Sequence, residues 1–213
     1  NLGHGTHVAG VVAGSLFEGL KGVAPGASLI NVKVLDDQGH GSTGGIVAGI
    51  EWAIDPDGNP TTDDGADVIS MSIGGAFSDE DTPLKEALME AVNDGIVVVI
   101  SSGNCGSGCP NSGCGNFRGV TTPGNLREVI TVGAVNDEGE AACFSSGQDF
   151  GDYIKPDVVA PGIDITSAGL NGGTRTMDGT SMAAPHIAGV AALMLDINST
   201  IGHYEFKDLL ESS

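Results

Sequence analysis

Two spacings of apolar residues alternate along the chain, and each predicts a different kind of secondary structure. Short runs rich in valine and isoleucine predict strands, at residues 27–35, 66–73, 96–101 and 128–135. Apolar residues at helical spacing predict helices over 43–54, between Thr82 and Gly95, and over 181–195 and 206–211. Residues 55–67 are rich in Asp, Gly, Pro and Thr and predict a surface loop.

The order of these segments indicates one α/β domain. Strands that alternate with helices favour a mostly parallel sheet, and the uninterrupted apolar run 96–101 is typical of a strand buried on both faces. With 213 residues, the chain is long enough for one such domain and hardly for two. Ligands of such sheets bind at the carboxyl ends of the strands, so candidate chemistry is expected there.

Composition excludes several classes of protein. The chain carries 28 acidic and 8 basic side chains, a formal net charge of −20, so it would repel nucleic acid. No stretch of about 18 apolar residues is apparent, which argues against a membrane span. The hydrophobic share of 40% argues against disorder. The acid excess fits either a salt-adapted or calcium-rich habitat or a solvated acidic surface.

Candidate chemistry lies in three segments: His4–Gly10 (HGTHVAG), Ser102–Asn104 (SGN) and Gly179–His186 (GTSMAAPH). Ser181 opens a predicted helix after a flexible turn, so its hydroxyl is expected near backbone N–H groups that can stabilise an oxyanion. A serine needs a nearby base to act as a nucleophile, and His4 is the candidate. Asn104 follows a buried strand, where its amide could donate to the same oxyanion.

These segments resemble the histidine, asparagine and serine motifs of the subtilases, the subtilisin-like serine peptidases. Three further matches occur in the family's order: Gly22–Ala27 (GVAPGA), Ser72–Gly75 (SIGG) and Asp157–Gly162 (DVVAPG). The resemblance implies a three-layer α/β fold with a mostly parallel central sheet flanked by helices. It implies that His4 is the general base and Ser181 the nucleophile. Asn104 would be the side-chain donor of the oxyanion hole, joined by the backbone N–H of Ser181.

The same resemblance suggests where substrate binds. Two segments resemble the walls of the S1 pocket, which holds the side chain before the cleaved bond (P1): Ser72, Ile73, Gly74, Ser101, Ser102 and Gly103. Their glycines leave room for a sizeable apolar P1 side chain. Gly39, His40 and Gly41 resemble the edge on which substrate pairs as an added strand. The expected activity is broad endopeptidase cleavage of polypeptides with an apolar P1 preference, through an acyl-enzyme intermediate.

One part of the family's pattern has no counterpart in residues 1–213. The third catalytic residue of subtilases is an Asp upstream of the histidine, whereas the first Asp here is Asp36. We expect one peptidase domain that is incomplete at its N-terminus and at its C-terminus, and weak or inactive alone. In subtilisin itself, loss of this Asp lowers the rate by about 3 × 10⁴. A catalytically silent subtilase domain that binds peptides or packs on a partner is the alternative.

The other histidines are interpreted as structural or surface residues. The family uses only the first histidine of the pair in its motif, so His7 is assigned a structural role. His186, one turn after Ser181, is assigned the same role, and His40 and His203 are expected at the surface. An α/β-hydrolase esterase needs Gly-x-Ser-x-Gly and a base after the nucleophile; it is disfavoured, because the motif around Ser181 ends in Ala183 and the candidate base His4 precedes the serine.

Four cysteines are the feature least typical of the family: Cys105, Cys109, Cys114 and Cys143. They permit three disulfide pairings, and free thiols or a zinc site are the other interpretations. Disulfides are favoured, and together with the resemblance they indicate an extracellular, secreted protein.

No cofactor is expected for catalysis, but structural calcium is considered. Its candidate segments are Asp36–Asp37, Asp63–Asp64 and Asp79–Asp81, each of which is otherwise a solvated acidic loop. Besides polypeptide substrates, a propeptide or an inhibitor is an expected partner. Neither nucleic acid nor a membrane is expected, and the chain is expected to be a monomer.

Overall fold

A parallel sheet lies at the centre of the protein. The computed structural model describes residues 3–15, 19–59, 61–62, 64–75, 82–109 and 114–212. The sheet is built from β1 (Val68–Met71), β2 (Val97–Ser101), β3 (Ile130–Val135) and β6 (Val158–Pro161), in the order β1-β2-β3-β6. All three pairings are parallel. The strands predicted over 66–73, 96–101 and 128–135 are confirmed, and so is the mostly parallel α/β sheet.

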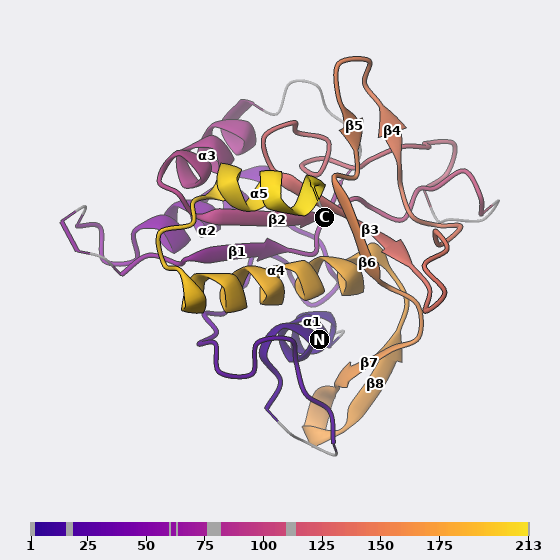
Figure 1. Ribbon diagram of the computed structural model, residues 1–213, viewed down its shortest axis with the longest axis horizontal. Helices are drawn as coiled ribbons and strands as arrows, with labels where there is room; N and C mark the ends of the chain where they lie inside the picture. Colours follow the sequence, from indigo (N-terminus) through magenta and orange to yellow (C-terminus); the bar gives the residue numbers. More distant parts are fainter. Residues whose placement is uncertain are drawn as a thin grey trace.

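Helices cover both faces of this sheet (Figure 1). In the described part of the chain they are α1 (His4–Ala13), α2 (Thr43–Ile54), α3 (Thr82–Asn93), α4 (Thr180–Ile197) and α5 (His203–Glu211). Helices α2, α3, α4 and α5 confirm the four predicted helices, whereas α1 was not predicted. Two antiparallel pairs complete the fold: β4 (Gln148–Asp149) with β5 (Ile154–Lys155), and β7 (Ile165–Ala168) with β8 (Thr174–Met177). A short 3₁₀ turn, η1 (Leu170–Gly172), joins β7 to β8.

Strand β2 is buried along its whole length and divides the core into two clusters. Val97 and Val99 pack with residues of α4 and α5 on one face. Val98 and Ile100 pack with residues of α2 and α3 on the other face. Because successive side chains of a strand point to opposite faces, a strand that is apolar throughout requires a helical layer on each side of the sheet.

Local signals in the sequence set the ends of two helices. The hydroxyl of Ser42 accepts a hydrogen bond from the backbone N–H of Gly45 at 3.2 Å and so caps the N-terminus of α2. Helix α3 ends at Asn93, and Gly95 follows with a φ of 87°. This left-handed conformation costs glycine little, and it turns the chain toward β2.

The strand predicted over 27–35 is wrong. Residues 28–34 have no regular secondary structure, and Leu29 and Ile30 are each 53% exposed. Valine and isoleucine favour an extended backbone, but a strand also needs a neighbour to share its hydrogen bonds. None of the described strands pairs with this segment, and β1 forms an edge of the four-stranded sheet.

Helix α4 corrects the expectation that no stretch is apolar enough to span a membrane. By length and composition alone its 18 residues meet that criterion, but half of them are buried inside the protein. Ala183, Ala184, Ala188 and Ala191 lie in the core cluster that also contains β2 and β3 residues. A core helix of a globular protein meets the same criterion, so the apolar character of α4 reflects its central position.

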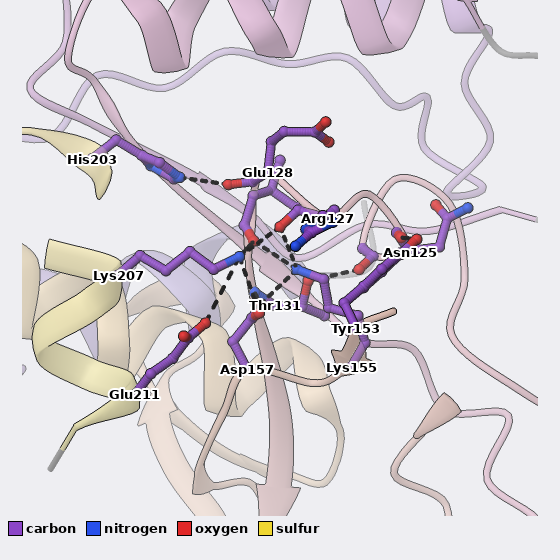
Figure 2. A network of polar contacts seen from close by, with 12 residues as sticks. Asn125, Arg127, Glu128, Thr131, Tyr153, Lys155, Asp157, His203, Lys207 and Glu211 are labelled. Carbon is purple, nitrogen blue, oxygen red and sulfur yellow. Dashed lines mark hydrogen bonds and ion pairs between the residues drawn. The ribbon is translucent and has the colours of Figure 1, made fainter. Parts of the chain in front are cut away.

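Polar side chains fasten α5 to the amino ends of the strands (Figure 2). Lys207 Nζ donates to the carbonyl oxygens of Arg127 (2.6 Å) and Val129 (3.0 Å) and pairs with Asp157 at 3.0 Å. Lys155, whose side chain is fully buried, pairs with Asp157 at 2.7 Å and donates to the carbonyl of Val129 at 2.7 Å. One carboxylate therefore serves two ammonium groups, and backbone carbonyls supply the remaining acceptors.

His203 lies in the same region and not at the surface, so that prediction is wrong. Its Nδ1 accepts a hydrogen bond from the backbone N–H of Val98 at 3.0 Å, and its Nε2 faces the carbonyl oxygen of Glu128 at 2.8 Å. Burial lowers the pKa of His203 below its usual value. A neutral ring, which accepts through one nitrogen and donates through the other, therefore suits this position between β2 and the segment before β3.

Lys155 gives the fold a measurable pH dependence. Burial is the main cause that lowers the pKa of Lys155 to about 8; the charge of Asp157 opposes it and that of Lys207 adds to it. The unfolded chain keeps the ordinary lysine value, so between these two values it binds more protons than the folded protein does. The free energy of unfolding is therefore expected to rise with pH from about 8 to about 10.5, by up to roughly 3 kcal/mol.

Denaturant titrations at a series of pH values in this window measure the effect. The Lys155→Met variant retains the pair between Asp157 and Lys207 and is expected to lose this rise. An equal rise in the variant would show that other groups cause it.

Candidate active site

Helix α4 begins where the central strands end, and Ser181 is its second residue. The backbone N–H of Gly179 donates to the carbonyl of Gly162, just after β6, at 2.8 Å. Gly179 has a φ of 151°, and a Cβ at this position would lie 3.3 Å from Nδ2 of Asn104. Both facts favour glycine there. The first N–H groups of a helix have no intrahelical acceptor, so that of Ser181 can serve a ligand.

Thr180 holds the side-chain amide of Asn104 in one orientation. The backbone N–H and the Oγ1 hydroxyl of Thr180 both donate to Oδ1 of Asn104 at 3.0 Å. The same Oγ1 accepts a hydrogen bond from the backbone N–H of Gly103 at 3.1 Å. Because Oδ1 is engaged, the Nδ2 group is left to donate elsewhere. These bonds place the predicted oxyanion donor beside the first turn of α4. Asn104 is also exposed, so a substrate could reach it.

Ser72 also fastens the first turn of α4. Pro185 lies inside the helix and has no N–H to donate to the carbonyl of Ser181, four residues earlier. The hydroxyl of Ser72 replaces this donor, at 2.8 Å from that carbonyl oxygen. In return, Ser181 Oγ lies 3.5 Å from the carbonyl oxygen of Ser72. The sequence reasoning missed this role of Ser72, although the proline four residues after Ser181 was a signal for it.

His4 is the first residue of α1, which packs against α4 and β7. Burial is the main cause that lowers the pKa of its ring below the usual value, and His7 and Arg175 add to the effect. A ring that is neutral near pH 7 can act as a general base. No hydrogen bond between the described His4 ring and the Ser181 hydroxyl is formed here. Such bonds often shorten only when substrate is bound.

Three other histidines occupy positions that agree with the sequence interpretation. His7 is fully buried, and its Nε2 lies 2.9 Å from the carbonyl oxygens of Ile165 and Arg175, which connects α1 to β7 and β8. His186 Nδ1 lies 2.8 Å from the carbonyl oxygen of Met182, within α4. His40 is exposed. In the described part of the chain, His7 and His186 therefore bond to backbone carbonyls and not to the Ser181 hydroxyl.

The segments predicted as S1 walls both lead to the first turn of α4. One consists of Ser72, Ile73 and Gly74 after β1, and the other of Ser101, Ser102 and Gly103 at the end of β2. The two strands are hydrogen-bonded neighbours, and Ser72 and Gly103 contact Ser181 and Thr180 as described above.

The predicted edge segment stands apart from these contacts. Gly39 and Gly41 are exposed beside a turn in which the carboxylate of Asp36 accepts from the backbone N–H groups of Gln38 and His40. In the described part of the chain, no hydrogen bond joins this turn to the Ser181 region. Its role in substrate binding stays a prediction.

Two disulfides fasten the chain beyond Asn104: Cys105–Cys114 and Cys109–Cys143. The disulfide interpretation is thus confirmed over free thiols and zinc, with one of the three possible pairings. Cys105 follows Asn104 directly, is 3% exposed, and donates its backbone N–H to Ser146 Oγ at 2.9 Å. The loop next to Asn104, the predicted oxyanion donor, is therefore connected covalently to the rest of the domain.

One acidic cluster lies in the loop after α2. Carboxylate oxygens of Asp55, Asp57 and Asp64 are within 4.8 Å of one another, a grouping compatible with calcium. Of the predicted calcium segments, only Asp64 contributes to it, and the sequence reasoning missed its two other members. Asp37 instead pairs with Lys33 at 2.9 Å. Asp36 accepts the two backbone hydrogen bonds described above. The remaining predicted candidates, Asp63 and Asp79–Asp81, lie outside the described residues.

Comparison with known sequences identifies the family. The sequence model of the subtilase family matches residues 1–213. The chain is a subtilase. Among curated subtilases, subtilisin E of Bacillus subtilis (strain 168) is 44% identical over 212 residues, which cover 99% of this chain and 50% of that protein. Subtilisin DY of Bacillus licheniformis is 42% identical over 213 residues, which cover 99% of this chain and 70% of that protein.

A solved structure agrees with the subtilase fold. The crystal structure of a cold-adapted subtilisin-like serine proteinase superposes with a TM-score of 0.81 at 33% sequence identity and covers 99% of this chain. The match covers 67% of that protein, and the chain spans about half the length of subtilisin E. The predicted three-layer subtilisin-like fold is confirmed.

The contact between Ser72 and Ser181 can be tested through stability. Ser72→Ala leaves the carbonyl of Ser181 without either its helical donor or its substitute, so the free energy of unfolding is expected to fall by about 1–3 kcal/mol. Ser70→Ala is the matched control, because the buried hydroxyl of Ser70 on β1 has no partner in the described structure. Denaturant titrations of both variants give the comparison, and equal losses would contradict the proposed contact.

Proposed function

We propose that residues 1–213 form most of the catalytic domain of a secreted serine endopeptidase that cleaves polypeptides through an acyl-enzyme intermediate. Membership of the subtilase family supports this class of reaction. The single observation that carries it is the fixed amide of Asn104, whose Oδ1 is held by Thr180, the residue next to Ser181. This arrangement prepares an oxyanion donor before substrate arrives.

Each residue then has a defined task. Ser181 Oγ attacks the carbonyl carbon of the scissile bond, while His4 removes the hydroxyl proton and delivers it to the leaving amine. The substrate oxygen, now negative, accepts hydrogen bonds from Asn104 Nδ2 and from the backbone N–H of Ser181. Water, deprotonated by His4, hydrolyses the acyl-enzyme and releases Ser181. Since burial keeps His4 largely neutral near pH 7, the base is in its active form.

The mechanism also needs a carboxylate to orient His4 and to stabilise its protonated form. We propose that an Asp upstream of residues 1–213 supplies it, as the subtilase pattern implies. These residues alone would then be weak or inactive, because Ser181 would lack an oriented base.

Several finer properties complete the proposal. Substrate would pair as an added strand at Gly39–Gly41, and its P1 side chain, apolar in character, would enter between the two S1 walls. The disulfides support an extracellular location. The protein would act as a monomer, and a propeptide or inhibitor would be able to occupy the proposed substrate-binding residues.

Fluorophosphonate labelling tests the nucleophile in the protein produced from its complete coding sequence. Ser181 is expected to be the labelled residue, and Asn104→Ala is expected to lower kcat by about 10²–10³ with little change in KM, the size of effect measured in subtilisin itself. Peptide mapping locates the label and steady-state kinetics measure the variant.

The silent-domain alternative predicts a different result. A folded protein that neither labels at Ser181 nor cleaves any peptide would support it and would refute the peptidase. Labelling at another serine, or an unchanged kcat in Asn104→Ala, would refute the assigned roles.

Structural calcium is also kept as a prediction, now for the loop after α2. If the carboxylates of Asp55, Asp57 and Asp64 share an ion, calcium relieves their mutual repulsion. The Tm is then expected to be higher in calcium than in a chelator, and Asp57→Asn is expected to reduce that difference. The exposed Asp208 on α5 provides the control, Asp208→Asn. An identical calcium effect in Asp57→Asn would refute this location.

A further inference from the structure

Thr121 occupies the space between the two S1 walls. Its side chain lies so close to Gly74 that a Cβ there would collide with the Thr121 hydroxyl. A Cβ on Gly103, in the opposite wall, would lie 2.6 Å from Oγ1 and 2.8 Å from Cγ2 of the same threonine. Both glycines therefore face one side chain. The sequence suggested room here for a sizeable P1 group, but the Thr121 side chain fills the space between Gly74 and Gly103.

Backbone hydrogen bonds hold this threonine in place from both sides. The N–H of Thr121 donates to the carbonyl of Ser102 at 3.0 Å, and the N–H of Gly75 donates to the carbonyl of Thr122 at 2.9 Å. The segment 121–122 thus bridges the two walls. A β-branched side chain has few rotamers, so Thr121, fixed through its backbone and packed on both sides, cannot turn aside for a larger group.

The exposure of these residues shows at which end the space between the two S1 walls is open. Gly74 is exposed and Gly103 is half-buried, whereas Thr121 is only 8% exposed. The space between the walls is therefore open at the glycines and closed at Thr121. The open end is next to the first turn of α4, because Gly103 donates to Thr180.

We propose that Thr121 is a specificity-determining residue that forms the floor of the S1 pocket and restricts P1 to small side chains, such as alanine. This inference rests on the proposed peptidase function and refines its apolar P1 preference. Leucine and phenylalanine would have to overlap the threonine or displace a segment bonded to both walls. Well-packed protein tolerates neither change easily.

Paired kinetic measurements test the proposal. For the protein made from its complete coding sequence, peptides that differ only in P1 are expected to rank Ala above Leu and Phe in kcat/KM. Thr121→Gly opens the floor and is expected to raise the ratio of Phe to Ala by at least about 10-fold, since one methylene in a pocket changes selectivity by 10–200-fold. Thr121→Val keeps the volume without the hydroxyl and is expected to retain the wild-type order.

Two kinetic results would overturn the proposal. A wild-type preference for Phe or Leu over Ala would do so, and the peptidase function would still stand. An unchanged order in Thr121→Gly that still cleaves the alanine peptide would do so as well.

A binding measurement covers the case in which no peptide is cleaved, a result that would count against the peptidase function. Peptides whose C-terminal residue is Ala, Leu or Phe occupy S1 as products do, and their Kd for Ser181→Ala needs no catalysis. Tighter binding of the alanine peptide, reversed by Thr121→Gly in the Ser181→Ala background, supports a small pocket. Tighter binding of the phenylalanine peptide before that change, or no binding of any of the peptides, overturns it.

Discussion

The first turn of α4 is held against the carboxyl ends of three strands, and the candidate site depends on that attachment. Gly179 is bonded to the segment after β6, Thr180 to the segment after β2, and Ser181 to Ser72 after β1. Pro185 makes the last bond necessary, because it removes the helical donor for Ser181. A helix that was apolar but not bonded in this way could slide over the sheet. These hydrogen bonds fix the position of the Ser181 hydroxyl and of the Ser181 backbone N–H, which packing alone would not do.

At the opposite end of the sheet, the fold has to accommodate buried charges. There the buried side chains are charged, and Asp157 with backbone carbonyls satisfies Lys155 and Lys207 before β3 and β6 begin. The cost of burying Lys155 falls when its ammonium loses a proton, at a pH where His4 is also neutral. Alkaline conditions therefore raise the free energy of unfolding through Lys155 at one end of the sheet, and they keep the proposed base His4 neutral at the other end. The two effects arise from separate residues and can be separated by mutation.

Features of the fold that depend on neighbouring residues in the chain could be predicted from the sequence, whereas features that depend on a distant partner could not. The apolar run of β2 and the helical spacing of apolar residues in α2 depend on neighbours in the chain, and both were predicted. The strand expected over 27–35 was wrong because pairing depends on a partner that composition does not reveal. His203 was misplaced because a lone histidine near a helix start does not show that Val98 will donate to it. The disulfides were favoured by composition, whereas their pairing needed the fold.

Gly74 and Gly103 show the same limit in the proposed pocket. A glycine in a sequence indicates that something approaches the backbone closely, and the family resemblance suggested that this would be the substrate. In the structure it is Thr121, more than forty residues from Gly74 and eighteen from Gly103. Motifs that place the nucleophile and the oxyanion donor therefore say little about the size of the pocket, because its floor comes from a segment with no catalytic motif. Within such a site, the chemistry and the choice of side chain can change independently, one through α4 and the other through residue 121.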